Sequence, residues 1–113
     1  MEIRLADGFY SITFGTRLGE AAGVITLDEG RLQGGDAIMF YIGSYATEGD
    51  RIFGNVRIAR HATLRDLTSV FGVEEADIDF SGLVAADGRI AGTATSPQAP
   101  GIEMSFAMRP LGR

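Results

Sequence analysis

Sixteen glycines are distributed along the 113 residues, and between them apolar side chains alternate with polar ones. In the first such segment Tyr10, Ile12 and Phe14 alternate with Ser11 and Thr13. Side chains two positions apart lie on the same face of a β-strand, so this period predicts strands with one buried face. Because many of the glycines follow Asp or Glu, tight turns are expected between the strands. The chain is therefore predicted to be mostly β.

The same period of two recurs later in the chain, which extends the prediction to a whole domain. Its apolar members are Ile52, Val56 and Ile58, then Ile78, Phe80 and Val84, then Ile102, Met104, Phe106 and Met108. Together with the turn residues, the pattern predicts eight strands, at residues 8–15, 19–28, 31–34, 38–47, 51–60, 76–85, 89–96 and 102–109. Short strands linked by hairpins favour an antiparallel barrel, because closure removes exposed edges. A single all-β domain over residues 1–113 is expected.

One segment departs from the period of two. Leu64, Leu67, Val70 and Phe71 recur at helical spacing. Thr63 and Asp66 resemble a capping box, and Gly72 supplies a residue that can end a helix. A short helix over residues 63–71 is therefore predicted, lying across an open end of the sheet.

Composition excludes several classes of function. The chain has no cysteine and a single histidine, which removes thiolate metal sites, disulfides and cysteine nucleophiles, so no metal and no cofactor is expected. The formal net charge of -5 disfavours direct binding to nucleic acid or to anionic lipid. No secretory signal leads the sequence and the longest apolar tract, residues 37–43, is too short for a membrane helix, so a cytoplasmic protein is expected.

No catalytic constellation is expected. His61 is the only imidazole, and no serine motif accompanies it. Asp77 and Asp79 share a strand face, but carboxylates at this spacing more often keep an exposed face soluble than catalyse proton transfer. The sequence thus predicts a protein that is not an enzyme.

Two further clusters have both a functional and a structural interpretation. Arg57, Arg60, His61 and Arg65 form a basic cluster that could hold an anion, although pairing with nearby acids is favoured. Gly34-Gly35-Asp36 resembles a phosphate loop only superficially, because a strand follows it rather than a helix. A corner in which Asp36 binds the amides of its own turn is favoured instead.

The strand predicted at 38–47 is apolar on both faces over residues 38–45. Ile38, Phe40 and Ile42 point one way, and three other side chains point the other way: Met39, Tyr41 and Tyr45. One face should enter the barrel, which leaves the other for a partner subunit, a protein ligand or a covering element. The second set, Met39, Tyr41 and Tyr45, is taken as the interface of a homodimer.

A family resemblance rests on the stretches DGFYSITF and GVITLDEGRLQGGDAIMFYIGSY. Its shared features are Asp7, Gly8, Tyr10, Ser11, Ile12, Phe14, Gly30, Gly34, Gly35, Asp36, Tyr41 and Gly43. In these residues the chain resembles the GrlR-like family of small bacterial negative regulators of type III secretion genes. The resemblance covers residues 7–60, and the remainder agrees in length and strand pattern. It implies a lipocalin-like small β-barrel that forms a homodimer and sequesters a transcriptional regulator by protein binding.

The resemblance is incomplete in the loop that binds the partner in that family. Four consecutive acidic residues are replaced here by Thr47-Glu48-Gly49-Asp50, so Glu48 and Asp50 are the candidate contacts with a protein partner. The first interpretation is therefore a non-enzymatic regulatory binding protein.

The alternative is a carrier or sensor of a small apolar ligand in the barrel lumen. The candidate lining residues are Tyr10 (or its neighbour Phe9), Phe14, Phe80, Met104, Phe106 and Met108. These side chains could equally fill a solid core, as they do in many small barrels.

Overall fold

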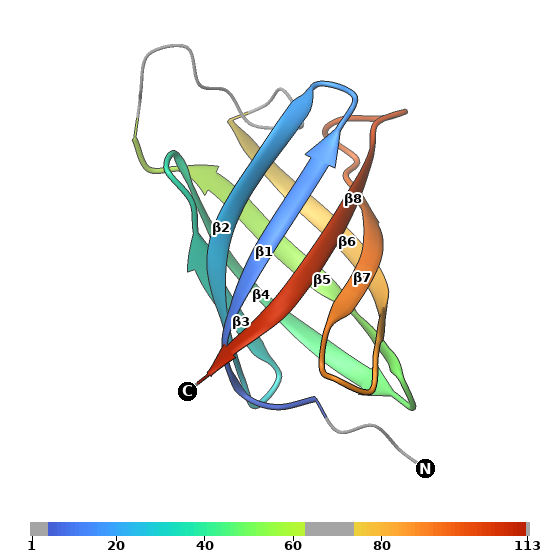
Figure 1. The fold of residues 1–113 in the computed structure, drawn as a ribbon. Helices are drawn as coiled ribbons and strands as arrows, with labels where there is room; N and C mark the ends of the chain where they lie inside the picture. The colour runs from blue at the N-terminus through green and yellow to red at the C-terminus, as the bar shows by residue number, and fades with distance from the viewer. Residues whose placement is uncertain (1–4, 63–73, 113) are drawn as a thin grey trace.

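The computed structural model describes residues 5–62 and 74–112, which form eight β-strands (Figure 1). The strands are β1 (Gly8–Thr16), β2 (Gly19–Asp28), β3 (Arg31–Gly35), β4 (Met39–Glu48), β5 (Arg51–Arg60), β6 (Glu75–Val84), β7 (Ile90–Thr95) and β8 (Glu103–Gly112). Each strand is antiparallel to its neighbours, and the strand order in the sheet follows the chain. The predicted strand ends differ from these bounds by at most one residue, except that β8 runs on to Gly112.

Pairing between the first and last strands closes the barrel. Phe14 of β1 lies opposite Ala21 of β2 on one side and opposite Phe106 of β8 on the other. Every strand pairs with a neighbour on each side, so the predicted closed antiparallel barrel is confirmed. The described residues contain no helix, and the helix predicted at 63–71 lies outside them.

The alternating sequence pattern corresponds to the inner and outer faces of the wall. Inward-pointing side chains such as Ile25, Ile58, Ile78 and Met104 are buried. Most of their neighbours along the strands face water, as the period of two predicts, although Ala59 next to Ile58 is buried. The core of the protein is therefore the interior of the barrel.

Two strands are much shorter than the rest, and each leaves part of its neighbour without a partner on one side. β3 pairs only with Val24–Asp28 of β2, so the first half of β2 pairs with β1 alone within the described part of the chain. β7 pairs only with Asp79–Val84 of β6, which leaves the start of β6 next to β5 alone. Both interruptions lie toward the same end, at which β1 ends and β2 begins (Figure 1).

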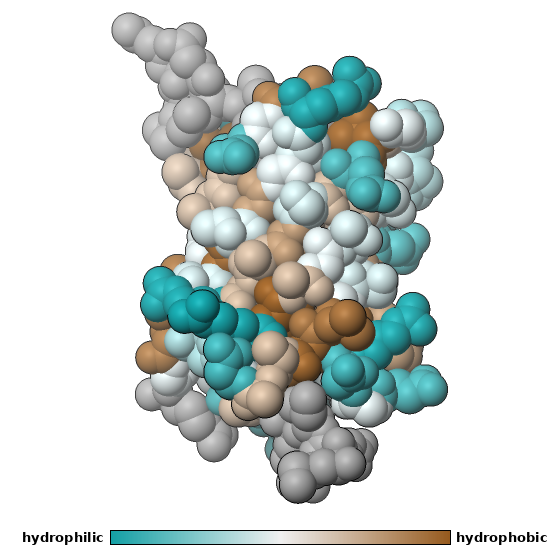
Figure 2. All heavy atoms as spheres, turned by 45° about the vertical axis from the view of Figure 1, so that its right-hand side comes forward, coloured by the Kyte–Doolittle hydropathy of each residue, from teal (hydrophilic) through white to brown (hydrophobic). Residues whose placement is uncertain are grey.

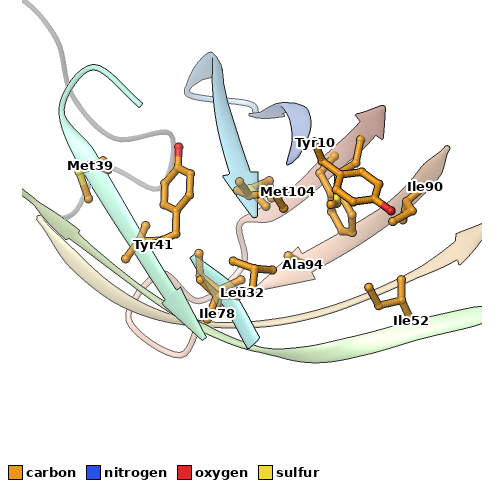
Figure 3. Close-up of a cluster of buried hydrophobic side chains, with 14 of the residues drawn as sticks. Tyr10, Leu32, Met39, Tyr41, Ile52, Ile78, Ile90, Ala94 and Met104 are labelled. Carbon is orange, nitrogen blue, oxygen red and sulfur yellow. The ribbon is translucent and has the colours of Figure 1, made fainter. Parts of the chain in front are cut away.

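The opposite end of the barrel is solidly packed. Leu27 and Ile52 are completely buried there, and Tyr10 is 1% exposed. Figure 3 shows Tyr10, Ile52 and Ile90 grouped together, away from Met39 and Tyr41. The Tyr10 hydroxyl donates a hydrogen bond of 2.6 Å to the Ala6 carbonyl oxygen, so its polar atom is satisfied.

Seven large apolar side chains of the described residues are exposed on the outside: Phe9, Leu18, Val24, Phe40, Ile42, Leu83 and Leu111. On the face shown in Figure 2, hydrophobic residues gather toward the packed end and are bordered by hydrophilic ones. Among residues 5–62 and 74–112, no helix is long and apolar enough to cross a membrane.

Candidate functional site

A cavity of about 290 Å³ lies inside the barrel, displaced from the packed end. Its wall is mostly apolar and comes from β1, β2, β3, β4, β5, β6 and β8, with Ile12, Leu32, Val56, Ile58 and Ile78 among the lining side chains. The volume is at the lower end of the range for small-molecule sites in proteins, about 300–1,000 Å³. The barrel interior is thus not completely filled by its own side chains.

The cavity extends to the interruption left by the short β3. Glu20, Ala21 and Ala22, which line it, belong to the half of β2 that has no β3 partner. Asp36, Ala37 and Ile38, which also line it, form the connection between β3 and β4. Glu20 and Ala37 are exposed, so this part of the lining reaches the surface.

The β3–β4 connection is held by Asp36. Its Oδ1 accepts hydrogen bonds from the backbone amides of Ile38 (2.9 Å) and Met39 (2.8 Å), and its own amide donates to the Met39 carbonyl oxygen (2.9 Å). A ring nitrogen of His61 lies 3.0 Å from the Asp36 carbonyl oxygen. The sequence-based interpretation of Asp36 as a residue that binds its own turn is confirmed.

The second carboxylate oxygen of Asp36 faces the interior. The Tyr41 hydroxyl donates a hydrogen bond to Asp36 Oδ2, and the Tyr41 ring packs edge-on against Phe14 with a centroid distance of 6.0 Å. Burial, and after it the hydrogen bond to Asp36, raises the pKa of Tyr41 far above its usual value of 10.0. Tyr41 is therefore a neutral donor whose proton is directed at Asp36.

Gly23 of β2 allows this pair to pack against the wall. A Cβ atom at Gly23 would lie 3.1 Å from the Tyr41 hydroxyl oxygen and 3.2 Å from Asp36 Cβ. It would also lie 2.5 Å from the Gly35 carbonyl oxygen, which is closer than Cβ atoms approach other atoms. A side chain here would displace the Asp36–Tyr41 pair, so glycine is required for the geometry of this part of the cavity.

Five of the six predicted lumen residues line this cavity: Phe14, Phe80, Met104, Phe106 and Met108. Phe80 and Phe106 pack edge to face with a centroid distance of 6.0 Å. The sixth, Tyr10, is buried inside the barrel but does not line the cavity, because it lies in the packed end. Its neighbour Phe9 is about half exposed.

Sequence reasoning missed the polar part of the cavity, which is formed by Glu20, Asp36 and Tyr41. The available signal was strand length. A strand predicted at 31–34 between two predicted strands of ten residues cannot pair along all of either neighbour, and the gap lies beside the turn that follows it. Residues of that turn and of the unpaired half of β2 are therefore placed at an opening.

The face of β4 that was predicted to form the interface points into the barrel, and the opposite face points outward. Met39 and Tyr41 are buried inside the barrel at 2% and 6% exposure, and Tyr45 is partly buried on the same inner face. The Tyr45 hydroxyl lies 3.4 Å from Asp7 Oδ1, to which it donates. Phe40 and Ile42 point outward instead, because the strand pleat alternates in this register. The predicted interface formed by Met39, Tyr41 and Tyr45 is therefore wrong, because these side chains lie inside the barrel.

The remaining polar candidates lie on the outer surface. Arg57 pairs with Glu75, and Arg60 Nε lies 3.8 Å from a Glu74 carboxylate oxygen. Arg57 and Arg60 therefore pair with nearby acids, whereas His61 contacts the Asp36 carbonyl oxygen and Arg65 is outside the described residues. His61 is exposed.

The predicted acidic positions are also on the surface. Asp77 and Asp79 are exposed, and Asp79 accepts a hydrogen bond of 3.1 Å from Asn55. Glu48 and Asp50 are exposed at the β4–β5 hairpin, at the other end of β4 from the connection over residues 36–38. No group of three or more His, Asp or Glu side chains suited to a metal ion occurs among the residues that the structure describes.

Fold and cavity together define the class of protein: a small eight-stranded antiparallel β-barrel with an apolar space inside it. Comparison with known proteins found no matching family model and no matching curated protein.

Proposed function

We propose that this barrel binds a small apolar molecule in its lumen, as a carrier or sensor, and performs no chemistry on it. The observation that carries this proposal is the internal cavity of about 290 Å³ with its apolar lining. Small barrels usually fill their interior with side chains, and an unfilled apolar space lowers stability unless something occupies it. Transfer of an apolar molecule from water into such a space is favourable.

Binding of N-phenyl-1-naphthylamine, an uncharged apolar fluorophore, tests the proposal. Saturable fluorescence enhancement at one site per chain is expected. Ala21→Phe should weaken the affinity at least about tenfold, because Ala21 lines the cavity opposite Phe14 and a ring there takes the ligand's space. Absence of saturable binding would overturn the proposal.

Ala107→Phe is the matched control. Ala107 is exposed on the outer face of β8 and does not line the cavity, so the same substitution there should leave the affinity unchanged. Circular dichroism of both variants establishes that the barrel is intact. Equal affinities of the two variants would place the fluorophore outside the lumen and contradict the proposal.

We propose a second candidate function, a regulatory protein that acts through protein binding, as the resemblance to the GrlR-like family implies. The observation that favours it is an apolar strip on the outer face of β4. Phe40 is 36% exposed and Ile42 is 52% exposed. The strip continues to Val24 of β2, because Gly35 of β3 lies between Val24 and Phe40 and is paired with both. Exposed apolar groups of this kind are frequent at protein interfaces.

Native mass spectrometry of the protein purified from its own host tests this second candidate. A homodimer, or a complex with a transcriptional regulator, is expected. Ile42→Arg should dissociate the dimer, and Glu48→Lys with Asp50→Lys should release the regulator, whereas Ala107→Arg should do neither. A monomer without companions, unaltered by these substitutions, would contradict it.

A further inference from the structure

The donors that surround Asp36 in the polar part of the cavity are already committed to its carboxylate. The Tyr41 hydroxyl donates to Asp36 Oδ2, and the amides of Ile38 and Met39 donate to Asp36 Oδ1. A hydroxyl group has one proton, so Tyr41 can offer a ligand only its oxygen lone pairs. The carboxylate of Asp36 likewise offers only acceptors. A ligand group that approaches the Asp36 carboxylate and the Tyr41 oxygen must therefore supply the donor.

The charges of the lining side chains also favour a ligand group that donates hydrogen bonds. The ionisable acids that line the cavity are Glu20 and Asp36, and within the described part of the chain no Lys, Arg or His lines it. His61 bonds the Asp36 carbonyl oxygen from outside the cavity. As far as the described lining shows, an anionic group placed here would face two carboxylates and no cationic side chain, which is unfavourable.

We propose that the ligand of this cavity is a small apolar amine, with its ammonium group at the β3 interruption and its apolar part in the lumen. This inference rests on the proposed lumenal function and names its ligand class. The ammonium group donates to the Asp36 carboxylate and the Tyr41 oxygen, and Glu20 adds a second negative charge from β2. Charge-assisted hydrogen bonds of this kind are stronger than neutral ones.

Volume limits the apolar part. An apolar cavity of about 150 Å³ in a protein interior holds a benzene molecule. The present cavity, at about 290 Å³, is roughly twice as large. The apolar part is therefore about the size of two small rings or a short alkyl chain, which excludes a long-chain lipid held entirely inside.

Three ligands that differ only in their head group test the proposal: decylamine, decanol and decanoic acid, each displacing N-phenyl-1-naphthylamine at neutral pH. Decylamine is expected to bind about tenfold more tightly than decanol, as one charge-assisted hydrogen bond predicts, and decanoic acid more weakly than both. Equal or tighter binding of decanoic acid would overturn the proposal.

Single substitutions attribute the preference to the named carboxylates. Glu20→Gln and Asp36→Asn should each reduce the ratio of decylamine to decanol affinity several-fold. Glu20→Gln is the safer variant, because Glu20 is exposed, whereas Asp36 also holds the β3–β4 turn. Glu103→Gln removes the same charge from an exposed site outside the cavity, so it should leave the ratio as it is in the wild type.

The results separate the two levels of the proposal. If the fluorophore and decanol bind but decylamine has no advantage, the amine specificity is wrong and the lumenal function stands. If none of the ligands binds, both are wrong. An advantage that survives in Glu20→Gln and Asp36→Asn but disappears in Glu103→Gln would place the ammonium group on the outer surface and overturn the assignment.

Discussion

β3 and β7 are both short, and the two interruptions they cause in the barrel wall are treated differently. Beside β7 the chain itself closes the interruption: Ser96 and Ala99 are buried, and Gln98 Oε1 accepts a hydrogen bond of 2.8 Å from the otherwise unpaired amide of Asp77. Beside β3 the short connection over residues 36–38 makes its hydrogen bonds within its own turn, through Asp36. It does not fill the interruption, and the cavity reaches the surface there. The two interruptions differ because the β7–β8 connection is long enough to fold back against the barrel wall, whereas the β3–β4 connection is not.

The comparison teaches that similar strand lengths do not predict similar function. The β7–β8 connection spans residues 96–102 and includes enough residues to supply both an apolar plug and a polar cap. Only three residues separate β3 from β4, so the gap there is left to a ligand, as we propose above.

The largest difference between the two connections is expected when a carboxylate is introduced into each of them. Ala99→Glu buries a charge in the packed β7–β8 connection, so the free energy of unfolding should fall by about 3 kcal/mol. Ala37→Glu puts the same group in the exposed β3–β4 connection, where a loss below about 1 kcal/mol is expected. Urea denaturation measures both. Equal losses would mean that the two connections are equally packed.

Alkaline pH should act on the β3 side through Tyr41. Its pKa is raised in the folded state, so the folded protein keeps a proton that the unfolded chain loses above the ordinary value of 10.0. This stabilisation is complete below that pH and is lost as the pH rises, by about 1.4 kcal/mol for each pH unit.

Tyr41→Phe sharpens the pH experiment. The variant should lose the Tyr41 hydrogen bond at neutral pH but show a shallower decline of stability above the ordinary tyrosine pKa. Denaturation at several alkaline pH values, followed together with tyrosinate absorbance, measures the slope. Parallel slopes in wild type and variant would contradict the assignment to Tyr41.

The smallest effect is expected from the polar cap beside β7. Gln98→Ala removes the acceptor for the Asp77 amide and for the Ser96 hydroxyl, which should cost about 1 kcal/mol of stability. Gln33→Ala, an exposed glutamine on β3, is the matched control and should cost less than about 0.5 kcal/mol. Thermal unfolding of the two variants checks the difference, and a reversed order would show that the Gln98 hydrogen bonds do not stabilise the wall.

The repeating strand pattern made the barrel predictable, whereas the site depends on features that such a pattern does not contain. Alternation along the strand places Ile52, Val56 and Ile58 on the inner face, and this does not depend on which strands are its neighbours. β4 is apolar on both faces, so its period of two does not say which face is inside, and Met39 and Tyr41 were placed outside for that reason.

The Asp36–Tyr41 pair shows a second limit. The local hydrogen bonds of Asp36 with its turn follow from residue type and spacing. Its contact with Tyr41 depends on Gly23 two strands away, and such cross-strand packing becomes visible only when the register of all three strands is known.

Closure of the barrel between β1 and β8 has a consequence for the order of folding. All other strand pairs join neighbours in sequence, whereas this one joins the two strands that are farthest apart along the chain. The entropy of loop closure grows with the number of residues enclosed, so contacts such as Phe14 with Phe106 form late, after the hairpins. Until then β1 and β8 both present unpaired backbone groups to other chains. Aggregation during refolding should therefore begin at these two strands, and it should increase with protein concentration.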